Sequence, residues 1–302
     1  MKINSAIITG ATGAIGSALV KKLLDSGAIV HAIVRPNSNR IKNLVKHENL
    51  FVYECDLSSL TYLKKFGIKA DAFFHLGWEK TTLSGRDDVQ AQLSNVIYSL
   101  TAVELAESAN AKVFVGAGSQ AEYGKVSSPL NCETPVNPTS GYGIAKYTAG
   151  KATALKCKSI GMRHCWARIL SVYGKNDSES SLISYLIKTF KAGEDAQLTK
   201  CEQIWDYIYS EDVADALIAI AEHGVDGREY PIGSGKGEPL KDFVIKVKNV
   251  VNNSCNVNFG AREYYPHQPM YLVADITQLT LDTGFTPKTD FTTGIKKLIG
   301  EL

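Results

Sequence analysis

The chain has 302 residues, 44% of them hydrophobic, which is enough to bury a large core without disulfides or a structural metal. Lys and Arg (33) nearly balance Asp and Glu (31), and the net charge of +2 argues against a dedicated nucleic-acid binder. No stretch approaches the roughly 18 apolar residues of a membrane span, and the six scattered cysteines form no C-x-x-C pair. The composition therefore predicts a cytoplasmic α/β protein with reduced thiols, no metal site and no membrane partner.

The first half of the chain alternates short apolar runs with longer segments whose apolar residues recur at helical spacing. This pattern predicts strands over residues 3–9, 28–34, 50–54, 71–76, 112–116 and 163–170. It predicts helices over residues 15–26, 41–46, 88–110 and 142–159. Because the strands are apolar on both faces and alternate with helices, we expect a Rossmann-type, doubly wound parallel sheet of the α/β class.

The alternation loosens after about residue 173. Helices are expected over residues 178–191 and 212–223, and segments rich in Gly and Pro follow them. We expect a main domain over residues 1–174, with 204–223 packing back on it. Residues 175–203 and 224–302 are expected to form a smaller C-terminal lobe.

Three glycines, Gly10, Gly13 and Gly16, stand between the first predicted strand and the first predicted helix. Glycines at this spacing permit a tight turn and let the backbone approach a pyrophosphate at the helix N-terminus. The strand–turn–helix context predicts that the main domain binds a dinucleotide. The expected contacts from this turn are Gly10, Thr12, Gly13, Ala14, Ile15 and Gly16.

The end of the second predicted strand bears on which dinucleotide is bound. An NAD site usually places an Asp or Glu here for the ribose diol, whereas a basic residue suits the 2′-phosphate of NADP. No acidic residue occurs from residue 26 to 47, and Arg35, Ser38 and Arg40 follow the strand. Charge-assisted hydrogen bonds from these side chains to the 2′-phosphate favour NADP(H), and NAD(H) is kept as the alternative cofactor. The alternative is a solvated basic loop.

Tyr142 and Lys146 are four residues apart on a predicted helix and therefore share one face of it. A tyrosine with an ordinary pKa near 10 is a poor acid at neutral pH, and a nearby ammonium group lowers that pKa. Ser119, just past the fifth strand, is placed where its hydroxyl could hold a carbonyl oxygen. Alone, the Tyr–Lys pair would indicate only a helix surface, but with the glycine turn it predicts catalysis.

Together these motifs resemble the extended short-chain dehydrogenase/reductase family, also called the NAD(P)-dependent epimerase/dehydratase family. Other segments similar to the family are Cys55-Asp56-Leu57, Phe74-His75-Leu76-Gly77, Asn95, and the stretches over residues 167–174 and 206–214. The resemblance implies that Ser119 and Tyr142 contact the reacting oxygen, while Lys146 binds the nicotinamide ribose and tunes Tyr142. It also implies cofactor contacts from Asp56, Leu57, Leu76, Gly77, Tyr142 and Lys146. It further implies a nucleotide-sugar substrate and a homodimer formed through helices near residues 88–110 and 142–159.

Departures from the family pattern narrow the reaction. Dehydratases of the family carry an acidic pair directly after the Ser, but here Gln120 and Ala121 follow it. Glu122 is shifted by one residue and would point to the opposite side if the segment were extended. Ala121 also cannot exchange protons, which argues against the epimerase–reductase chemistry of GDP-fucose synthases. An NADPH-dependent reductase of a 4-keto-6-deoxyhexose is favoured, and stretches over residues 258–263 and 270–275 resemble bacterial CDP- and dTDP-linked reductases of that kind.

Two arginines that hold the diphosphate in many relatives are replaced here by Trp205 and by the segment Tyr265-Pro266-His267-Gln268. Either Arg262, Arg228 or Lys200 compensates, or the substrate is not a nucleotide diphosphate. The expected substrate contacts are Ser119, Gln120, Ser171, Trp205, Arg262 and Tyr265. The competing functions are a nucleotide-sugar 4-epimerase, a reductase of phenolic or steroidal ketones, and an NADP(H) sensor without catalysis.

Overall fold

The computed structural model describes residues 1–82, 85–265 and 268–300, and the centre of this part is a seven-stranded sheet in the order β11-β6-β5-β4-β1-β2-β3. Every neighbouring pair in the sheet is parallel. Its strands are β1 (Ser5–Thr9), β2 (Ile29–Val34), β3 (Leu50–Glu54), β4 (Ala72–His75), β5 (Val113–Ser119), β6 (Arg163–Ile169) and β11 (Glu229–Ile232). The strand order reverses beside β1, where doubly wound sheets bind dinucleotides, so the Rossmann prediction is confirmed.

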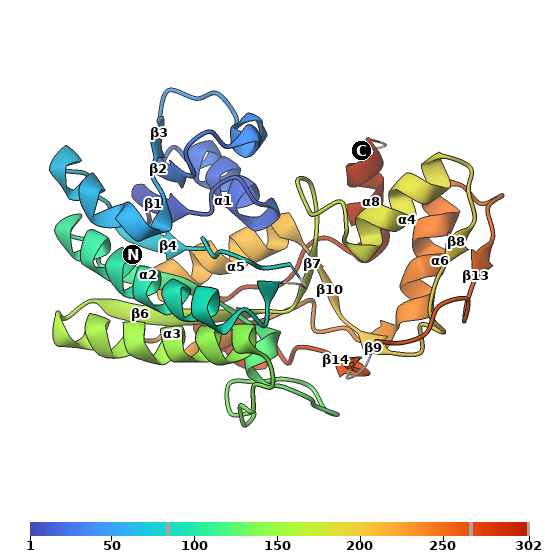
Figure 1. Cartoon of the computed structure of the whole chain (residues 1–302). Coiled ribbons are helices and arrows are strands. Elements are labelled where there is room, and N and C mark those ends of the chain that lie inside the picture. The colour runs from blue at the N-terminus through green and yellow to red at the C-terminus, as the bar shows by residue number, and fades with distance from the viewer. Residues whose placement is uncertain (83–84, 266–267, 301–302) are drawn as a thin grey trace.

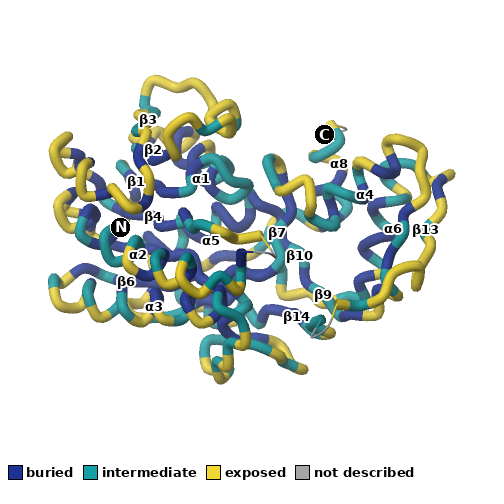
Figure 2. The backbone as a smooth tube through the Cα atoms, in the orientation of Figure 1, coloured by how far each residue is buried: buried dark blue, intermediate teal, exposed yellow. Residues whose placement is uncertain are grey.

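Helices cover both faces of the sheet (Figure 1). On one face α1 (Ala14–Asp25) packs against α5 (Ser210–His223), and α7 (Thr277–Thr283) packs against α5 and β11. On the other face α2 (Val89–Ser108) packs against α3 (Gly141–Ser159) and against the 3-10 helix η2 (Leu57–Phe66). Each face therefore buries its own apolar cluster, and Figure 2 shows the buried strands between them.

The smaller lobe has a separate core. It contains α4 (Leu182–Lys191), α6 (Leu240–Val251) and α8 (Phe291–Ile299), which lie together on the right of Figure 1. Phe190, Phe243 and Phe291 are buried among them, and the rings of the last two are 4.7 Å apart. Short strands complete the lobe and its junction with the main domain: β7 (Ser171–Tyr173) with β10 (Tyr207–Tyr209), β9 (Ile204–Trp205) between β12 (Glu238–Pro239) and β14 (Tyr271–Leu272), and β8 (Ala196–Gln197) with β13 (Val257–Asn258).

Several boundaries differ from the sequence-based predictions. β11 lies inside the range 224–302 that we assigned to the lobe, yet it pairs with β6 as an edge strand of the main sheet. Its four residues include a proline, which is tolerated at an edge but weakens a strand prediction. The helix expected over residues 41–46 is a 3-10 helix, η1 (Asn39–Asn43), and β5 runs three residues further than expected, to Ser119.

In the part of the chain that the structure describes, no helix is long and apolar enough to cross a membrane. The same residues contain no cluster of His, Cys, Asp and Glu side chains that could hold a metal ion. The six cysteines are all free, and every one except the partly exposed Cys132 is buried.

Candidate active site

The turn between β1 and α1 forms an open backbone cradle. Gly10 has a φ of +70°, and a Cβ atom there would lie 2.7 Å from the nitrogen of Gly77, so only glycine fits. A Cβ atom at Gly16 would overlap the carbonyl oxygen of Gly10. Gly13 is the N-cap of α1 and no side chain caps the first turn, which leaves its N–H groups available to an anion. The cradle therefore fits the pyrophosphate of a dinucleotide, beside the predicted contacts Thr12, Ala14 and Ile15.

Beyond the cradle, a pocket opens at the carboxyl end of β2. It is lined by Arg35, Pro36, Asn37, Ser38, Asn39, Arg40 and Asp56. Arg40 Nη2 donates to the backbone oxygen of Asn176 at 2.7 Å, which ties this loop to the segment leading into the lobe. The structure brings Arg35, Ser38 and Arg40 together, as predicted. Two carboxylates from beyond the acid-free segment 26–47 also lie near this loop. Asp56 lines the pocket, and Glu54 accepts from Asn37 N at 3.5 Å.

The end of β4 closes the sheet side of the cradle. His75 is fully buried, and its two ring nitrogens lie 2.9 Å from Thr9 Oγ1 and 3.1 Å from Ser99 Oγ. Burial, together with the charge of Lys146, lowers the pKa of His75 to about 3, so the imidazole is neutral at physiological pH. Thr9 Oγ1 also accepts from Gly77 N at 3.0 Å, which fixes the backbone there. The other predicted contacts on this side are Leu57, which is buried, and Leu76, which lines the adjoining cleft.

A cleft of about 420 Å³ lies between the sheet and the lobe, and Ser119, Tyr142 and Lys146 all line it. Tyr142 and Lys146 lie one turn apart on α3. The N-cap of this helix is Ser140, whose Oγ accepts from Gly143 N at 3.1 Å. Ser119 is the last residue of β5, and its side chain hydrogen-bonds Tyr142. The structure thus brings the three predicted catalytic residues into one cleft beside the dinucleotide cradle.

The electrostatics of this group differ from our expectation. Burial raises the pKa of Tyr142, while the charge of Arg86 and the hydrogen bond with Ser119 act to lower it. Burial also lowers the pKa of Lys146 to about 7, although the carboxylate of Glu122 opposes this shift. Lys146 Nζ donates to the oxygen of Ala117 at 2.7 Å. In this structure the charge of Arg86 also acts to lower the pKa of Tyr142, a contribution that the sequence did not indicate.

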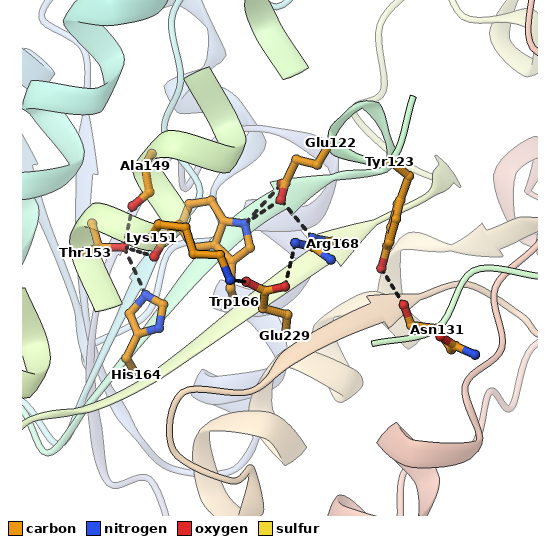
Figure 3. Close-up of polar contacts among 11 residues, drawn as sticks. Glu122, Tyr123, Asn131, Ala149, Lys151, Thr153, His164, Trp166, Arg168 and Glu229 are labelled. Atoms are coloured by element: carbon orange, nitrogen blue, oxygen red, sulfur yellow. Dashed lines mark hydrogen bonds and ion pairs between the residues drawn. The ribbon is translucent and has the colours of Figure 1, made fainter. Parts of the chain in front are cut away.

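A buried ionic network joins Glu122, Trp166, Arg168 and Glu229 (Figure 3). Glu122 is fully buried, and its carboxylate accepts from Ser119 N at 2.8 Å, from Trp166 Nε1 at 3.0 Å and from Arg168 Nε at 2.8 Å. Arg168 also pairs with Glu229 at 2.5 Å. The segment that carries Glu122 is a 3-10 turn, η4 (Gln120–Glu122), rather than the extended chain we assumed. Glu122 still points away from the cleft, because the turn folds it back beneath Ser119.

The model of the NAD dependent epimerase/dehydratase family matches residues 6–233 of the chain. The chain belongs to this family. It is 27% identical to the CDP-abequose synthase of Salmonella typhimurium over 98% of this chain and 97% of that protein. It is also 27% identical to the dTDP-6-deoxy-L-talose 4-dehydrogenase (NAD(+)) of Aggregatibacter actinomycetemcomitans, over 85% of this chain and 96% of that protein. The UDP-N-acetylglucosamine 4-epimerase of Methanobrevibacter ruminantium M1, solved with UDP-N-acetylmuramic acid, superposes with a TM-score of 0.89 at 25% identity and full coverage of both chains.

Membership in the epimerase/dehydratase family makes the chain an NAD(P)-dependent enzyme, as the resemblance implied. Among the predicted substrate contacts, Gln120, Ser171 and Trp205 line the cleft together with Ser119. Trp205 Nε1 donates to Ser171 Oγ at 2.8 Å, so these two side chains form one wall.

Arg262 and Tyr265 do not line the cleft. Arg262 is exposed with its guanidinium 5.7 Å from the ring of Tyr185, and Tyr265 is 70% exposed. The reason is local pairing: β13 pairs with β8, and Arg262 N donates to the oxygen of Leu198 at 3.0 Å, which holds this segment along the outside of the lobe. Pro266 and His267, which belong to the same prediction, lie outside the described residues.

Sequence reasoning missed other residues of the cleft, of which the most prominent are Trp78, Arg86, Asp177 and Tyr207. Trp78 stacks edge-on against Tyr142 with ring centroids 6.1 Å apart, and Lys146 Nζ lies 3.7 Å from the Trp78 ring centroid. Burial raises the pKa of Asp177. Trp78 and Arg86 lie in the long connection after β4, and loops after the carboxyl ends of parallel strands commonly build such sites. Their position after a predicted parallel strand was the signal available in the sequence. This connection has no periodic pattern, however, so the signal did not single out Trp78 or Arg86.

Proposed function

We propose that this enzyme is an NADPH-dependent reductase of a nucleotide-activated 4-keto-6-deoxyhexose. The observation that carries the proposal is the pocket after β2, where Arg35, Ser38 and Arg40 lie together at the position suited to a 2′-phosphate. A reductase consumes NADPH and exchanges it in each cycle, whereas a 4-epimerase retains NAD. The names of the two relatives support the sugar class, since one is a CDP-sugar synthase and the other a 4-dehydrogenase of a dTDP-6-deoxy sugar.

The cleft also supports reduction over dehydration. Elimination of water needs a further acid and base beside the serine, but Gln120 has a neutral side chain and Ala121 has no proton to exchange. The carboxylate nearest to Ser119, that of Glu122, is fully buried and paired with Arg168, so it does not line the cleft. The carboxyl group of Asp177 does line the cleft, but it comes from the segment leading into the lobe and not from the positions directly after Ser119.

The reaction requires hydride and proton transfer to one carbonyl group. The nicotinamide supplies the hydride when the cofactor is bound in the cradle of α1. Tyr142 then donates its phenolic proton to the carbonyl oxygen, and the Ser119 hydroxyl holds that oxygen by a hydrogen bond. Lys146, fixed by the oxygen of Ala117 at 2.7 Å, is placed to bind the nicotinamide ribose. Trp205 and Ser171 also line this cleft and would contact the sugar.

The test is a panel of CDP-, dTDP-, UDP- and GDP-4-keto-6-deoxyhexoses assayed for consumption of NADPH. We expect turnover with at least one of them and formation of the corresponding 4-hydroxy sugar. Interconversion of 4-hydroxy sugars, with NAD retained through purification and no loss of NADPH absorbance, would instead establish the 4-epimerase. The carboxylates of Glu54 and Asp56 beside the nucleotide pocket favour that second function, because a carboxylate there suits the ribose diol of NAD.

Substitution of Arg35 by Asp is expected to shift the cofactor preference toward NADH. Loss of a charge-assisted contact and gain of a carboxylate should change the ratio of kcat/KM for NADPH over NADH by about 10- to 100-fold. The matched control is Lys42→Asp, which makes the same charge change in η1 but outside the pocket lining. An unchanged ratio in the Arg35 variant would refute the phosphate assignment.

We also propose that the enzyme is a homodimer formed through α2 and α3. Exposed apolar side chains occur at four-residue intervals on α2: Val89 is 59%, Leu93 53% and Ile97 60% exposed. On the adjacent α3, Ile144 and Leu155 are 49% and 71% exposed. An apolar stripe at helical spacing on two packed helices is suited to a matching stripe in a second copy.

The free, mostly buried cysteines support a cytoplasmic location for the enzyme.

The variant Leu93→Glu is expected to convert the dimer to a monomer, because it buries an unpaired charge at the centre of the interface. Light scattering coupled to size exclusion measures the mass directly. Leu281→Glu is the control, since Leu281 is 73% exposed on α7, away from the α2–α3 face. A Leu93 variant that keeps the mass of the unmodified protein would exclude this interface.

A further inference from the structure

Arg86 lies in the connection between β4 and α2, directly over Tyr142. Its guanidinium carbon is 4.7 Å from the centroid of the Tyr142 ring, within the range of a cation–π contact. Its backbone oxygen accepts from Tyr142 N at 2.7 Å. A side-chain contact and a backbone contact therefore hold Arg86 against the start of α3.

In the described part of the chain, the guanidinium group of Arg86 is not paired with a carboxylate. Within the described residues, none of the ion pairs includes Arg86, and its Nε donates to the backbone oxygen of Thr81 at 3.2 Å. The neighbouring cation Lys80 behaves differently, since it pairs with Asp88 at 2.5 Å. The guanidinium of Arg86 thus faces Tyr142 and lines the cleft.

Lys146 is less well placed to act on the phenol in this structure. Its ammonium group is 5.8 Å from the Tyr142 ring centroid, further than Arg86, and lies 3.7 Å from the Trp78 ring centroid. Its hydrogen bond goes to the oxygen of Ala117. The remaining groups around Tyr142 are the Ser119 hydroxyl and the Glu122 carboxylate, and the latter opposes a negative charge on the phenol.

We propose that Arg86 acts through Tyr142, by stabilising the phenolate that forms when Tyr142 gives up its proton. The inference rests on the proposed function for the direction of the reaction. When the carbonyl group is reduced, the O–H bond of Tyr142 breaks, its proton forms the new hydroxyl group, and the phenolate remains beside the guanidinium. Arg86 holds that negative charge until solvent returns a proton to Tyr142. Arg86, which lies between β4 and α2, thus acts together with Tyr142 and Lys146 of α3.

The test measures ionisation of Tyr142 without substrate or cofactor. Protein with ¹³C-labelled tyrosine is titrated by NMR, and the Tyr142 signal is assigned by its loss in Tyr142→Phe. Arg86→Met should move the titration of Tyr142 to higher pH, Arg86→Lys should move it less, and Lys80→Met should leave it in place. In the reductase assay, Arg86→Met should lower kcat by about tenfold at neutral pH, with partial recovery in Arg86→Lys.

An unchanged Tyr142 titration in Arg86→Met would overturn the proposal. A higher KM with unchanged kcat would also overturn it, because Arg86 would then bind substrate alone. If no 4-keto sugar is turned over by the unmodified enzyme, the proposed function fails, while the titration still decides the role of Arg86. Circular dichroism of each variant checks that α3 has kept its fold.

Discussion

Replacement of Tyr142 by Phe is expected to lower kcat by at least about 100-fold while NADPH binding stays nearly intact, because the variant lacks the proton that the carbonyl oxygen must receive. The ring still packs edge-on against Trp78, since Phe keeps the aromatic face. The hydrogen bond with Ser119 is lost, so the serine alone would hold the reacting oxygen. Steady-state kinetics gives kcat, and quenching of protein fluorescence by NADPH gives the dissociation constant.

The control for this variant is Tyr147→Phe. Tyr147 lies on the same helix, one turn from Gly143, but it is partly exposed and does not line the cleft. Tyr147→Phe also removes a phenolic hydroxyl group from α3, and it should leave kcat unchanged. If turnover survives in the Tyr142 variant, Tyr142 is not the acid, and the cleft carboxyl of Asp177 would be the next group to examine.

Substitution of Glu122 by Ala should destabilise the fold by about 3–5 kcal/mol, because it leaves a buried cation without one of its partners. Arg168 is 1% exposed and would keep only Glu229 as a carboxylate partner. Ser119 N and Trp166 Nε1 would lose their acceptor as well. Urea unfolding followed by circular dichroism measures the loss. Glu122→Gln should cost less, since the amide oxygen can still accept from Ser119.

Lys151 provides the comparison. It pairs with Glu229 at 2.6 Å at the outer end of the same network, but its side chain is 53% exposed. A solvent-screened pair contributes at most about 1 kcal/mol, so Lys151→Met should change the free energy of unfolding by no more than that. Equal losses at Glu122 and Lys151 would show that burial does not determine the strength of this network.

Local patterns predicted the parts of the site that depend on local geometry. Gly16 is required by backbone contacts within the turn itself, Gly10 has a positive φ that favours glycine, and Tyr142 and Lys146 share a face by helical spacing alone. Arg86 could not be found in the same way, because its distance to Tyr142 depends on how the connection after β4 folds across the start of α3.

Two segments differ from what the sequence led us to expect, although Glu122 points away from the cleft as expected. Glu122 was treated as part of an extended segment, but its carboxylate closes the 3-10 turn by accepting from Ser119 N. Gly118 makes this possible, since a Cβ atom there would lie 2.6 Å from Glu122 Oε1. Arg262 was expected in the cleft because of its charge, but pairing of β13 with β8 carries it to the outer surface. The spacing from Ser119 to Glu122 is that of a capping box, whereas nothing in the sequence near Arg262 signals the pairing of β13 with β8.

The three tryptophans give this enzyme a built-in optical probe. Trp78 and Trp205 both line the cleft, while Trp166 lies outside it in the Glu122 network, and each indole N–H has its own acceptor. Reduced nicotinamide absorbs where tryptophan emits, so cofactor docking should quench the cleft pair by energy transfer. Exposure of Trp166 to water should shift its emission to the red only when the network itself opens. A single fluorescence spectrum can therefore separate ligand occupancy from loss of the fold, and Trp78→Phe and Trp205→Phe would divide the occupancy signal between the two tryptophans.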